Sequence, residues 1–149
     1  MNKLGHIDES GKINMIDNTD KPGGMKEAEA SGFIHLKPET VHLIRENELE
    51  KGVVITMAEI AGMQAAKRTA ELIPLVHQTT LTRIDVKAYV FPNGIEVKSL
   101  VKADCPSSLE AEALIAVSAA LITLYEVCKT ADPSMTISDI KIQRKTSIV

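Results

Sequence analysis

Alternation of apolar and polar residues predicts four β-strands in this chain. It is strongest over residues 82–91 and 95–103, which Pro92-Asn93-Gly94 joins as a tight hairpin turn. Weaker alternation over residues 27–36 and 135–144 predicts a first and a last strand. The apolar face of the hairpin is formed by Ile84, Val86, Ala88, Val90, Ile95, Val97 and either Ser99 or Leu100. We therefore expect the two central strands to be antiparallel neighbours.

Two helices are predicted before the hairpin from a period of 3.6 residues. The first is short and covers residues 38–47, with Pro38 in its first turn, where a missing N–H costs nothing. Lys51-Gly52 is then expected to interrupt the pattern. The second is long and covers residues 53–72. It is expected to stop before Pro74, because the residue before a proline is disfavoured in the helical region.

A third helix is predicted after the hairpin. Either Ser107 or Ser108 can cap it, and Glu110 stands three residues after Ser107, in capping-box register. The helix is expected to run to about Lys129. Because residues 113–125 are apolar on most sides but too short to span a bilayer, we expect a buried central helix.

The predicted order β-α-α-β-β-α-β is that of an α+β, ferredoxin-like fold with one extra helix. Such a fold is an antiparallel sheet with its helices packed on one face. The other face would need cover, and an apolar second face would imply oligomerisation. Residues 1–24, rich in Gly, Asp, Asn and Lys, predict a flexible N-terminal segment. Residues 25–149 then form a single domain.

Composition limits the classes of function that the chain can serve. A length of 149 residues suits one domain, and a net charge of −3 with 3% aromatic residues argues against a nucleic-acid surface. Residues 1–20 contain no apolar segment of the kind that a secretory signal needs. Cys105 and Cys128 are expected to be free thiols in a reducing cytoplasm. No metal-binding motif is present, and no cofactor is expected.

Several charged residues have both a structural and a functional interpretation. Lys67 and Arg68 precede Glu71 at helical spacing, so they form either an exposed ion-paired surface or a clamp for phosphate. His77 is either an ordinary loop residue or a group for proton transfer or phosphate contact.

The ends of the third helix carry further candidates. Glu126 and Lys129 are three residues apart in its last turn, so they form either a helix-end ion pair or a general acid–base pair. Glu110 and Glu112 open the same helix, where the helix dipole alone accounts for two carboxylates.

Seven segments of the chain resemble the cyclic pyranopterin monophosphate synthases of molybdenum-cofactor biosynthesis. They follow the order and spacing of that family from about Met15 to Lys145, nearly the whole chain. The segments are Met15-Ile16-Asp17, Lys51-Gly52-Val53, residues 58–69 (AEIAGMQAAKRT), residues 72–77 (LIPLVH), residues 110–114 (EAEAL), residues 124–129 (LYEVCK) and Lys145.

The resemblance implies an activity, an assembly and a set of site residues. The enzymes of this family rearrange a cyclised dihydro-GTP triphosphate to cyclic pyranopterin monophosphate and release diphosphate. The family implies ferredoxin-like subunits in a hexamer, built as a trimer of dimers with sites shared between subunits. Glu126 and Lys129 would be the catalytic acid–base pair. The substrate-binding positions would be Leu75, Val76, His77, Ala111 and Glu112, with Lys51, Lys67, Arg68 and Lys145 neutralising the phosphates.

The chain departs from the family pattern at several of these positions. Glu126 replaces the catalytic Asp, and Val76 and Ala111 replace Cys and Met. Gln78 replaces a Pro, Ser108-Leu109 replaces Gly-Val, and the tail after Lys145 lacks the family's glycine-rich loop. A displacement near 1 Å at a reacting group can cost on the order of 100-fold in rate. Two hypotheses therefore follow: an active synthase, or a catalytically silent relative that acts as a nucleotide-binding or assembly subunit.

Overall fold

The structure is a computed structural model that describes residues 4–46 and 48–148, with the side chains of residues 48–52 and 148 outside the description. The strands and helices follow the predicted order, with one additional short helix before the hairpin. The elements are β1 (Met25–His35), α1 (Pro38–Glu46), α2 (Glu48–Lys67), α3 (Thr69–Leu72), β2 (Arg83–Phe91), β3 (Gly94–Asp104), α4 (Glu110–Cys128) and β4 (Thr136–Ile148).

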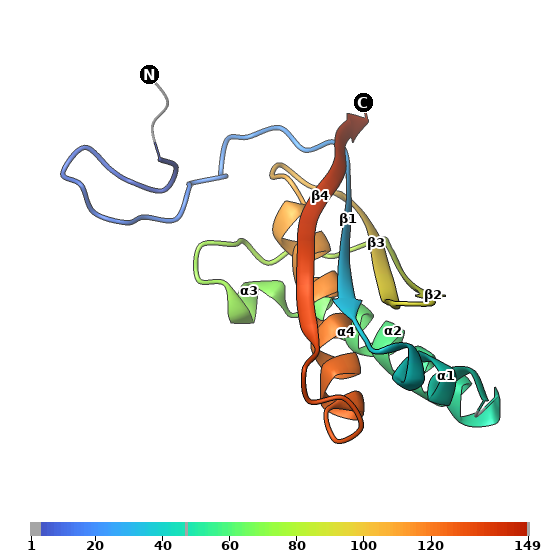
Figure 1. The fold of residues 1–149 in the computed structure, drawn as a ribbon. Coiled ribbons are helices and arrows are strands. Elements are labelled where there is room, and N and C mark those ends of the chain that lie inside the picture. Colours follow the sequence, from blue (N-terminus) through green and yellow to red (C-terminus); the bar gives the residue numbers. More distant parts are fainter. Residues whose placement is uncertain (1–3, 47, 149) are drawn as a thin grey trace.

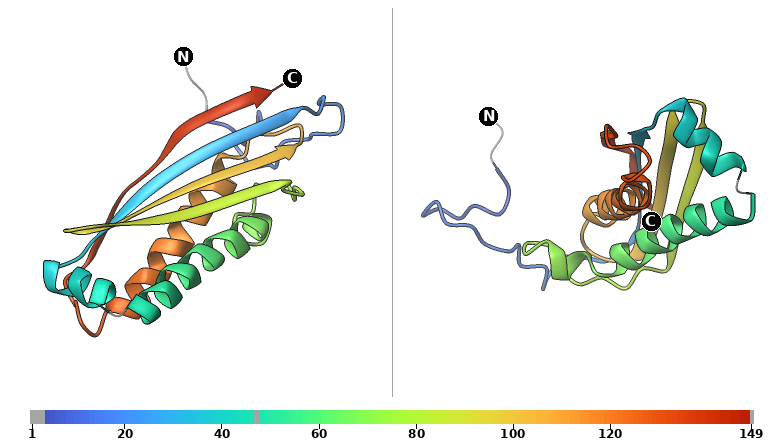
Figure 2. Two further views of the ribbon diagram at one scale, coloured as in Figure 1. Left: turned by 90° about the vertical axis from the view of Figure 1, so that its right-hand side faces the viewer. Right: turned by 60° about the horizontal axis from the view of Figure 1, so that its bottom comes forward.

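The four strands form one antiparallel sheet in the order β2-β3-β1-β4. This order places the first strand beside the third and the last at the far edge, which is the split β-α-β topology of the ferredoxin-like fold. Helices α2 and α4 lie on one face of the sheet, and the other face is open (Figures 1 and 2). The predicted α+β, ferredoxin-like class is confirmed.

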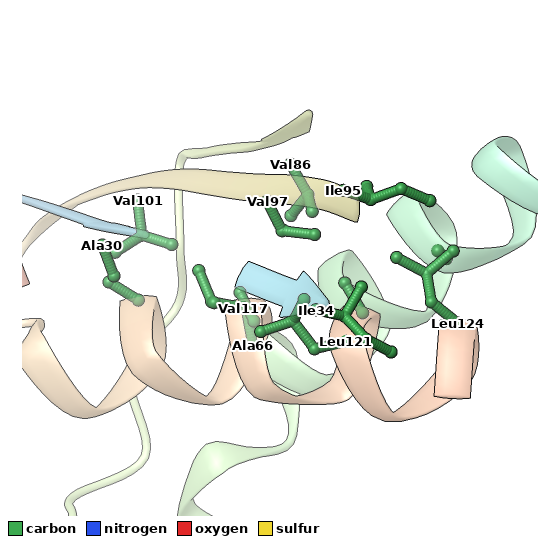
Figure 3. Close-up of a cluster of buried hydrophobic side chains, with 14 of the residues drawn as sticks. Ala30, Ile34, Ala66, Val86, Ile95, Val97, Val101, Val117, Leu121 and Leu124 are labelled. Carbon is green, nitrogen blue, oxygen red and sulfur yellow. The ribbon is translucent and has the colours of Figure 1, made fainter. Parts of the chain in front are cut away.

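The core fills the space between the sheet and the two long helices. Inward-facing residues of the strands meet α4 and α2, as Figure 3 shows for Val97, Val117, Leu121 and Ala66. Ser99, and not Leu100, continues the buried face of β3, since its hydroxyl donates to the carbonyl oxygen of Ala113 at 2.8 Å. That bond satisfies a polar group which would otherwise be buried without a partner.

The helical segment before the hairpin differs from the prediction. Helix α2 begins at Glu48 and runs through Lys51-Gly52, so these two residues do not interrupt it. A glycine inside a helix costs only about 1 kcal/mol, which the packing of a long helix offsets. Helix α2 ends at Lys67, because Arg68 has a non-helical backbone (φ −109°, ψ 16°), and the short α3 follows it.

Helix α4 begins later than predicted. Its N-cap is the buried Leu109, and no side chain caps it, so the proposed capping box of Ser107 and Glu110 is wrong. Ser107 lies in a loop, where its carbonyl oxygen accepts from the thiol of Cys105 at 3.0 Å. With a mean hydropathy of 1.7, this helix is apolar enough by composition to cross a membrane. In the structure, one side of the helix is buried against the sheet, and the other side is exposed, as Ile122 is at 59%.

The open face of the sheet carries charge. Arg144 on β4 donates to Glu29 at 2.9 Å and to Glu27 at 3.3 Å, both on the neighbouring β1. Lys102 on β3 approaches Glu27 from the other side at 3.9 Å. The apolar second face that would have implied oligomerisation is therefore replaced by cross-strand ion pairs at these positions.

The two edge strands of the sheet differ in what limits further strand pairing at each edge. On β2, the backbone N–H of Ala88 donates to the Glu59 carboxylate of α2 at 3.0 Å, so a helix side chain occupies part of this edge. On β4, the pairing with β1 shifts register around Ala30 and Ser31, and Asp139 has a left-handed backbone (φ 58°). Strand β4 continues past the predicted end at Arg144 to Ile148, so Lys145 lies within it.

Candidate functional site

A cleft of about 450 Å³ lies where β1 begins and β3 ends. Three parts of the chain form its walls: the N-terminal segment, the loop after α3 and the first turn of α4 with the loop before it. Its size suits a nucleotide-sized ligand. The lining residues are His6, Ile16, Asn18, Lys21, Leu75, Val76, His77, Pro106, Ser107, Ser108, Glu110, Ala111 and Glu112.

The cleft brings together the substrate-binding positions that the sequence suggested. All five of them line it, although they come from two segments more than thirty residues apart in the chain. They are Leu75, Val76, His77, Ala111 and Glu112. The fold places the loop after α3 beside the start of α4, which periodicity alone does not predict.

Glu112 is the least ordinary group in the cleft. Its side chain is 3% exposed, and its Oε1 is buried without a hydrogen-bond partner among the described residues. Burial raises the pKa of this carboxyl above its ordinary value of 4.5, partly offset by a hydrogen bond from its own backbone N–H. A buried oxygen without a partner is costly, so Glu112 is suited to accept a hydrogen bond from a ligand.

His77 is held from the N-terminal segment. Its Nδ1 lies 3.2 Å from the Nδ2 of Asn18, and its carbonyl oxygen accepts from the Thr79 hydroxyl at 3.4 Å. Asp17 is next to Asn18, and its pKa is lowered by hydrogen bonds from the Thr19 hydroxyl and backbone N–H and, more weakly, by His77. The ring of His77 thus contacts a segment whose role the sequence left unassigned.

The N-terminal segment supplies residues that sequence reasoning missed. His6, Ile16, Asn18 and Lys21 all line the cleft. Asp8 organises the preceding turn, where its carboxylate accepts from the N–H and the hydroxyl of Ser10, the N–H of Lys12 and the amide of Asn14. The likeness of Met15-Ile16-Asp17 to the synthase motif was the signal available. The prediction that residues 1–24 are flexible stays a prediction.

The proposed acid–base pair lies at the other end of α4. Lys129 donates to the carboxylate of Glu126 at 2.7 Å, and their side chains are 49% and 66% exposed. This hydrogen bond and the nearby negative charge raise the pKa of Lys129 above its ordinary value. Glu126 comes about four turns after Glu112, a separation of ~21 Å along the helix axis. Within one chain, the pair therefore does not reach the cleft.

The predicted phosphate-binding cations are dispersed. Lys145 reaches the first turn of α4, where its Nζ lies 3.2 Å from the Glu110 carboxylate at the cleft wall. Lys67 and Arg68 are exposed, are not in the cleft lining and have no ion pair with a described carboxylate. The side chain of Lys51 lies outside the described residues. Lys21 is the one Lys or Arg among the described lining residues.

No metal site is found in the part of the chain that the structure describes, where no three His, Cys, Asp or Glu residues cluster suitably. Cys105 and Cys128 are both buried and unpaired with each other. Burial raises the pKa of each thiol above the ordinary value of 9.0, which makes them poor nucleophiles.

Comparison with known proteins supplies a family. Residues 15–147 match the MoaC family. A protein called cyclic pyranopterin monophosphate synthase, from Parvibaculum lavamentivorans, is 42% identical over 97% of this chain and 91% of its own length. A molybdenum cofactor biosynthesis bifunctional protein from Chlorobaculum tepidum is 44% identical over 95% of this chain, which spans only 45% of that relative. These names favour the active synthase over the silent relative.

Proposed function

Since the chain belongs to the MoaC family, we propose that it acts in molybdenum-cofactor biosynthesis as a cyclic pyranopterin monophosphate synthase. Its substrate is then a cyclised dihydro-GTP triphosphate, and its products are cyclic pyranopterin monophosphate and diphosphate. The observation that supports this most is the assembly of the five implied substrate positions in one cleft. We also propose that the protein works in the cytoplasm.

The cleft suits the two chemically different parts of this substrate. The heterocycle carries N–H donors, which the buried carboxylate oxygen of Glu112 can accept. The triphosphate carries several negative charges and requires cations if it is to leave water. Lys21 lines the cleft and Lys145 stands beside it, paired with Glu110.

Glu126 and Lys129 act in this proposal on the cleft of a neighbouring subunit. The separation of ~21 Å along α4 is too long for a pair in the same chain to touch a ligand in the cleft. A closed oligomer whose subunits contribute opposite ends of α4 removes the difficulty. A hexamer, built as a trimer of dimers with shared sites, is the assembly that we propose.

The pair also has a defined chemical state. Lys129 is protonated at neutral pH, as any lysine with an ordinary or raised pKa is. In the proposal its ammonium group donates a proton to the rearranging substrate, and the contact with Glu126 is exchanged for one with the substrate in that step, because the contact makes the lysine a weaker acid. Glu126 is suited to return the proton. The extra methylene of Glu126, compared with the family's Asp, leaves the ion pair intact at 2.7 Å, so this change preserves the contact between the two groups.

The test is the synthase assay on the purified protein. We expect turnover of cyclic dihydro-GTP with release of diphosphate, and a loss of about 100-fold or more in kcat for Lys129→Ala. Lys141→Ala removes an exposed lysine of β4 outside the cleft and serves as the matched control. Wild-type protein without turnover would contradict the proposed function. Turnover unaffected by Lys129→Ala would contradict the role of that residue alone.

A further inference from the structure

Asn18 makes a side-chain contact that ties the N-terminal segment to the cleft. Its amide nitrogen Nδ2 lies 3.2 Å from the Nδ1 of His77, 59 residues later in the sequence. Both residues line the cleft, and both are partly buried. The contact therefore lies within the proposed binding site.

The identity of the two atoms determines where the histidine proton is. The NH2 group of an asparagine can only donate, so the Nδ1 that faces it must accept and carries no proton. A neutral imidazole then holds its single proton on Nε2. None of the residues that the structure describes hydrogen-bonds to this Nε2, so His77 offers an N–H donor to a ligand.

Neighbouring acids do not compete for the same nitrogen. Asp17, the residue before Asn18, uses its Oδ1 to accept hydrogen bonds from the Thr19 N–H at 2.9 Å and from the Thr19 hydroxyl at 2.5 Å. The remaining charged groups of the cleft are Glu110, Glu112 and Lys21. None of them has a described hydrogen bond to His77, so Asn18 is the side chain that sets the state of the ring.

The other end of the same amide is left without a partner. The Oδ1 of Asn18 is buried and has no partner among the described residues, as is true of Oε1 of Glu112 in the same cleft. Two buried acceptors without partners in one cleft carry a free-energy cost in the empty protein. A ligand with N–H donors would remove that cost. The cleft would then offer the ligand both acceptors, from Asn18 and Glu112, and a donor, from His77.

We propose that Asn18 is a positioning residue that fixes His77 as the Nε2–H tautomer and so makes it a hydrogen-bond donor to the substrate. The proposal rests on the proposed function for the identity of the ligand. It does not rest on it for the tautomer, which is a property of the empty protein. Through the same bond, the N-terminal segment is held as a wall of the cleft.

The tautomer is measurable in the ligand-free protein from the ring nitrogen NMR shifts of His77. In the neutral ring we expect a protonated Nε2 and an unprotonated Nδ1. Asn18→Asp replaces the donor by an acceptor, so we expect Nδ1 to become protonated. Asn93→Asp makes the same change in the exposed β2–β3 turn and should leave the His77 shifts unaltered. A wild-type ring with its proton on Nδ1 would overturn the proposal.

Kinetics give a second and independent readout. With the wrong tautomer, Asn18→Asp should lose more than about tenfold in kcat/KM, since a misplaced imidazole proton is costly in catalysis. Asn18→Ala frees the ring to take either tautomer and should lose less. Unchanged unfolding temperatures for both variants would show that the fold is intact. Equal kcat/KM for wild type and Asn18→Asp would overturn the positioning role, and inert wild-type protein would reject the proposed function while the NMR result still decides the tautomer.

Discussion

At the scale of single residues, the cleft contains groups that are poorly placed for stability and well placed for binding. Glu112 is the clearest case, since a carboxyl that is 3% exposed has an oxygen without a partner in the described chain. A ligand that supplies N–H donors would recover the free energy that this burial costs. A role in binding thus explains the position of Glu112 better than the helix dipole does, although the dipole was a sufficient explanation when only the sequence was considered.

Glu112→Gln should separate stability from binding. Burial raises the folded-state pKa of the carboxyl, so wild-type stability falls as the pH rises through the ordinary value of 4.5 toward the folded value. The amide does not ionise, so the free energy of unfolding of the variant should rise relative to that of wild type as the pH increases above the ordinary value of 4.5. Urea melts at several pH values measure it, with the exposed Glu71→Gln as control. We also expect about tenfold weaker substrate binding.

Lys21 makes a second prediction, at a position that sequence reasoning missed. It is the one Lys or Arg in the described cleft lining, so Lys21→Gln should weaken diphosphate binding about tenfold, as the loss of one charge-assisted contact would. Calorimetry with diphosphate measures the affinity. Lys12→Gln changes an exposed lysine of the same segment and should bind as wild type does. Equal affinities for all three proteins would remove Lys21 from the site.

At the scale of elements, α4 links the two halves of the proposed chemistry. Its first turn lines the cleft, and its last turn carries Glu126 and Lys129. Asp132 anchors the chain just beyond it: its N–H donates to the Cys128 carbonyl at 2.9 Å. Its carboxylate accepts from the Lys37 N–H at 2.8 Å. The end of α4 is therefore tied to the start of α1.

Removing that anchor should destabilise the fold. Asp132 is 1% exposed and also accepts from the hydroxyls of Thr40 at 3.0 Å and Ser134 at 3.4 Å. Asp132→Ala therefore removes the acceptor of three donors and should cost about 3 kcal/mol. The hydrogen bond from the Lys37 N–H lowers its pKa, so this stability is present above the ordinary value of 3.8 and is lost as the pH falls below it. Denaturant melts of Asp132→Asn and wild type should therefore converge in acid. The exposed Asp20→Asn should show no such trend.

The elements also show which parts of the fold could be predicted. Strands with one buried face alternate strictly, so β2 and β3 were found almost to the residue. Local signals misled where tertiary packing decides, as at Lys51-Gly52 inside α2 and at Ser107, whose carbonyl serves Cys105 in a loop. The five cleft positions were predicted only through the resemblance to a family. The roles of Asn18 and Lys21 were not predicted, because they depend on where the N-terminal segment folds back onto the domain.

At the scale of the whole molecule, the proposed site needs more than one chain. Among the described residues, the largest group of exposed apolar side chains lies on the helices, while the open sheet face carries ion pairs together with the exposed rings of Tyr89 and Phe91. Those on the helices include Val53, Met57 and Ile60 of α2 and Ile122, Tyr125 and Val127 of α4. The distribution makes the helical layer the better candidate for association.

Shared sites predict complementation between inactive variants. His77→Ala removes a group of the cleft, and Lys129→Ala removes the proposed proton donor. Unfolded together and refolded as a mixture, they should recover roughly a quarter of wild-type turnover, since half of the dimers are mixed and each has one complete site. Each variant refolded alone is the control. No recovery from properly assembled mixtures would contradict sites shared between subunits.

The contact between Glu59 and Ala88 has a consequence for the solubility of the protein at high concentration. A free sheet edge is a template on which further chains can add, and the growth of insoluble fibres begins there. The carboxylate of Glu59 accepts a hydrogen bond from the backbone N–H of Ala88 on one edge of this sheet, so this N–H is not free to pair with another strand. On the other edge, the left-handed backbone of Asp139 within β4 and the charges of Lys141 and Arg144 oppose the addition of a flat, apolar strand. The protein should therefore stay dispersed at high concentration.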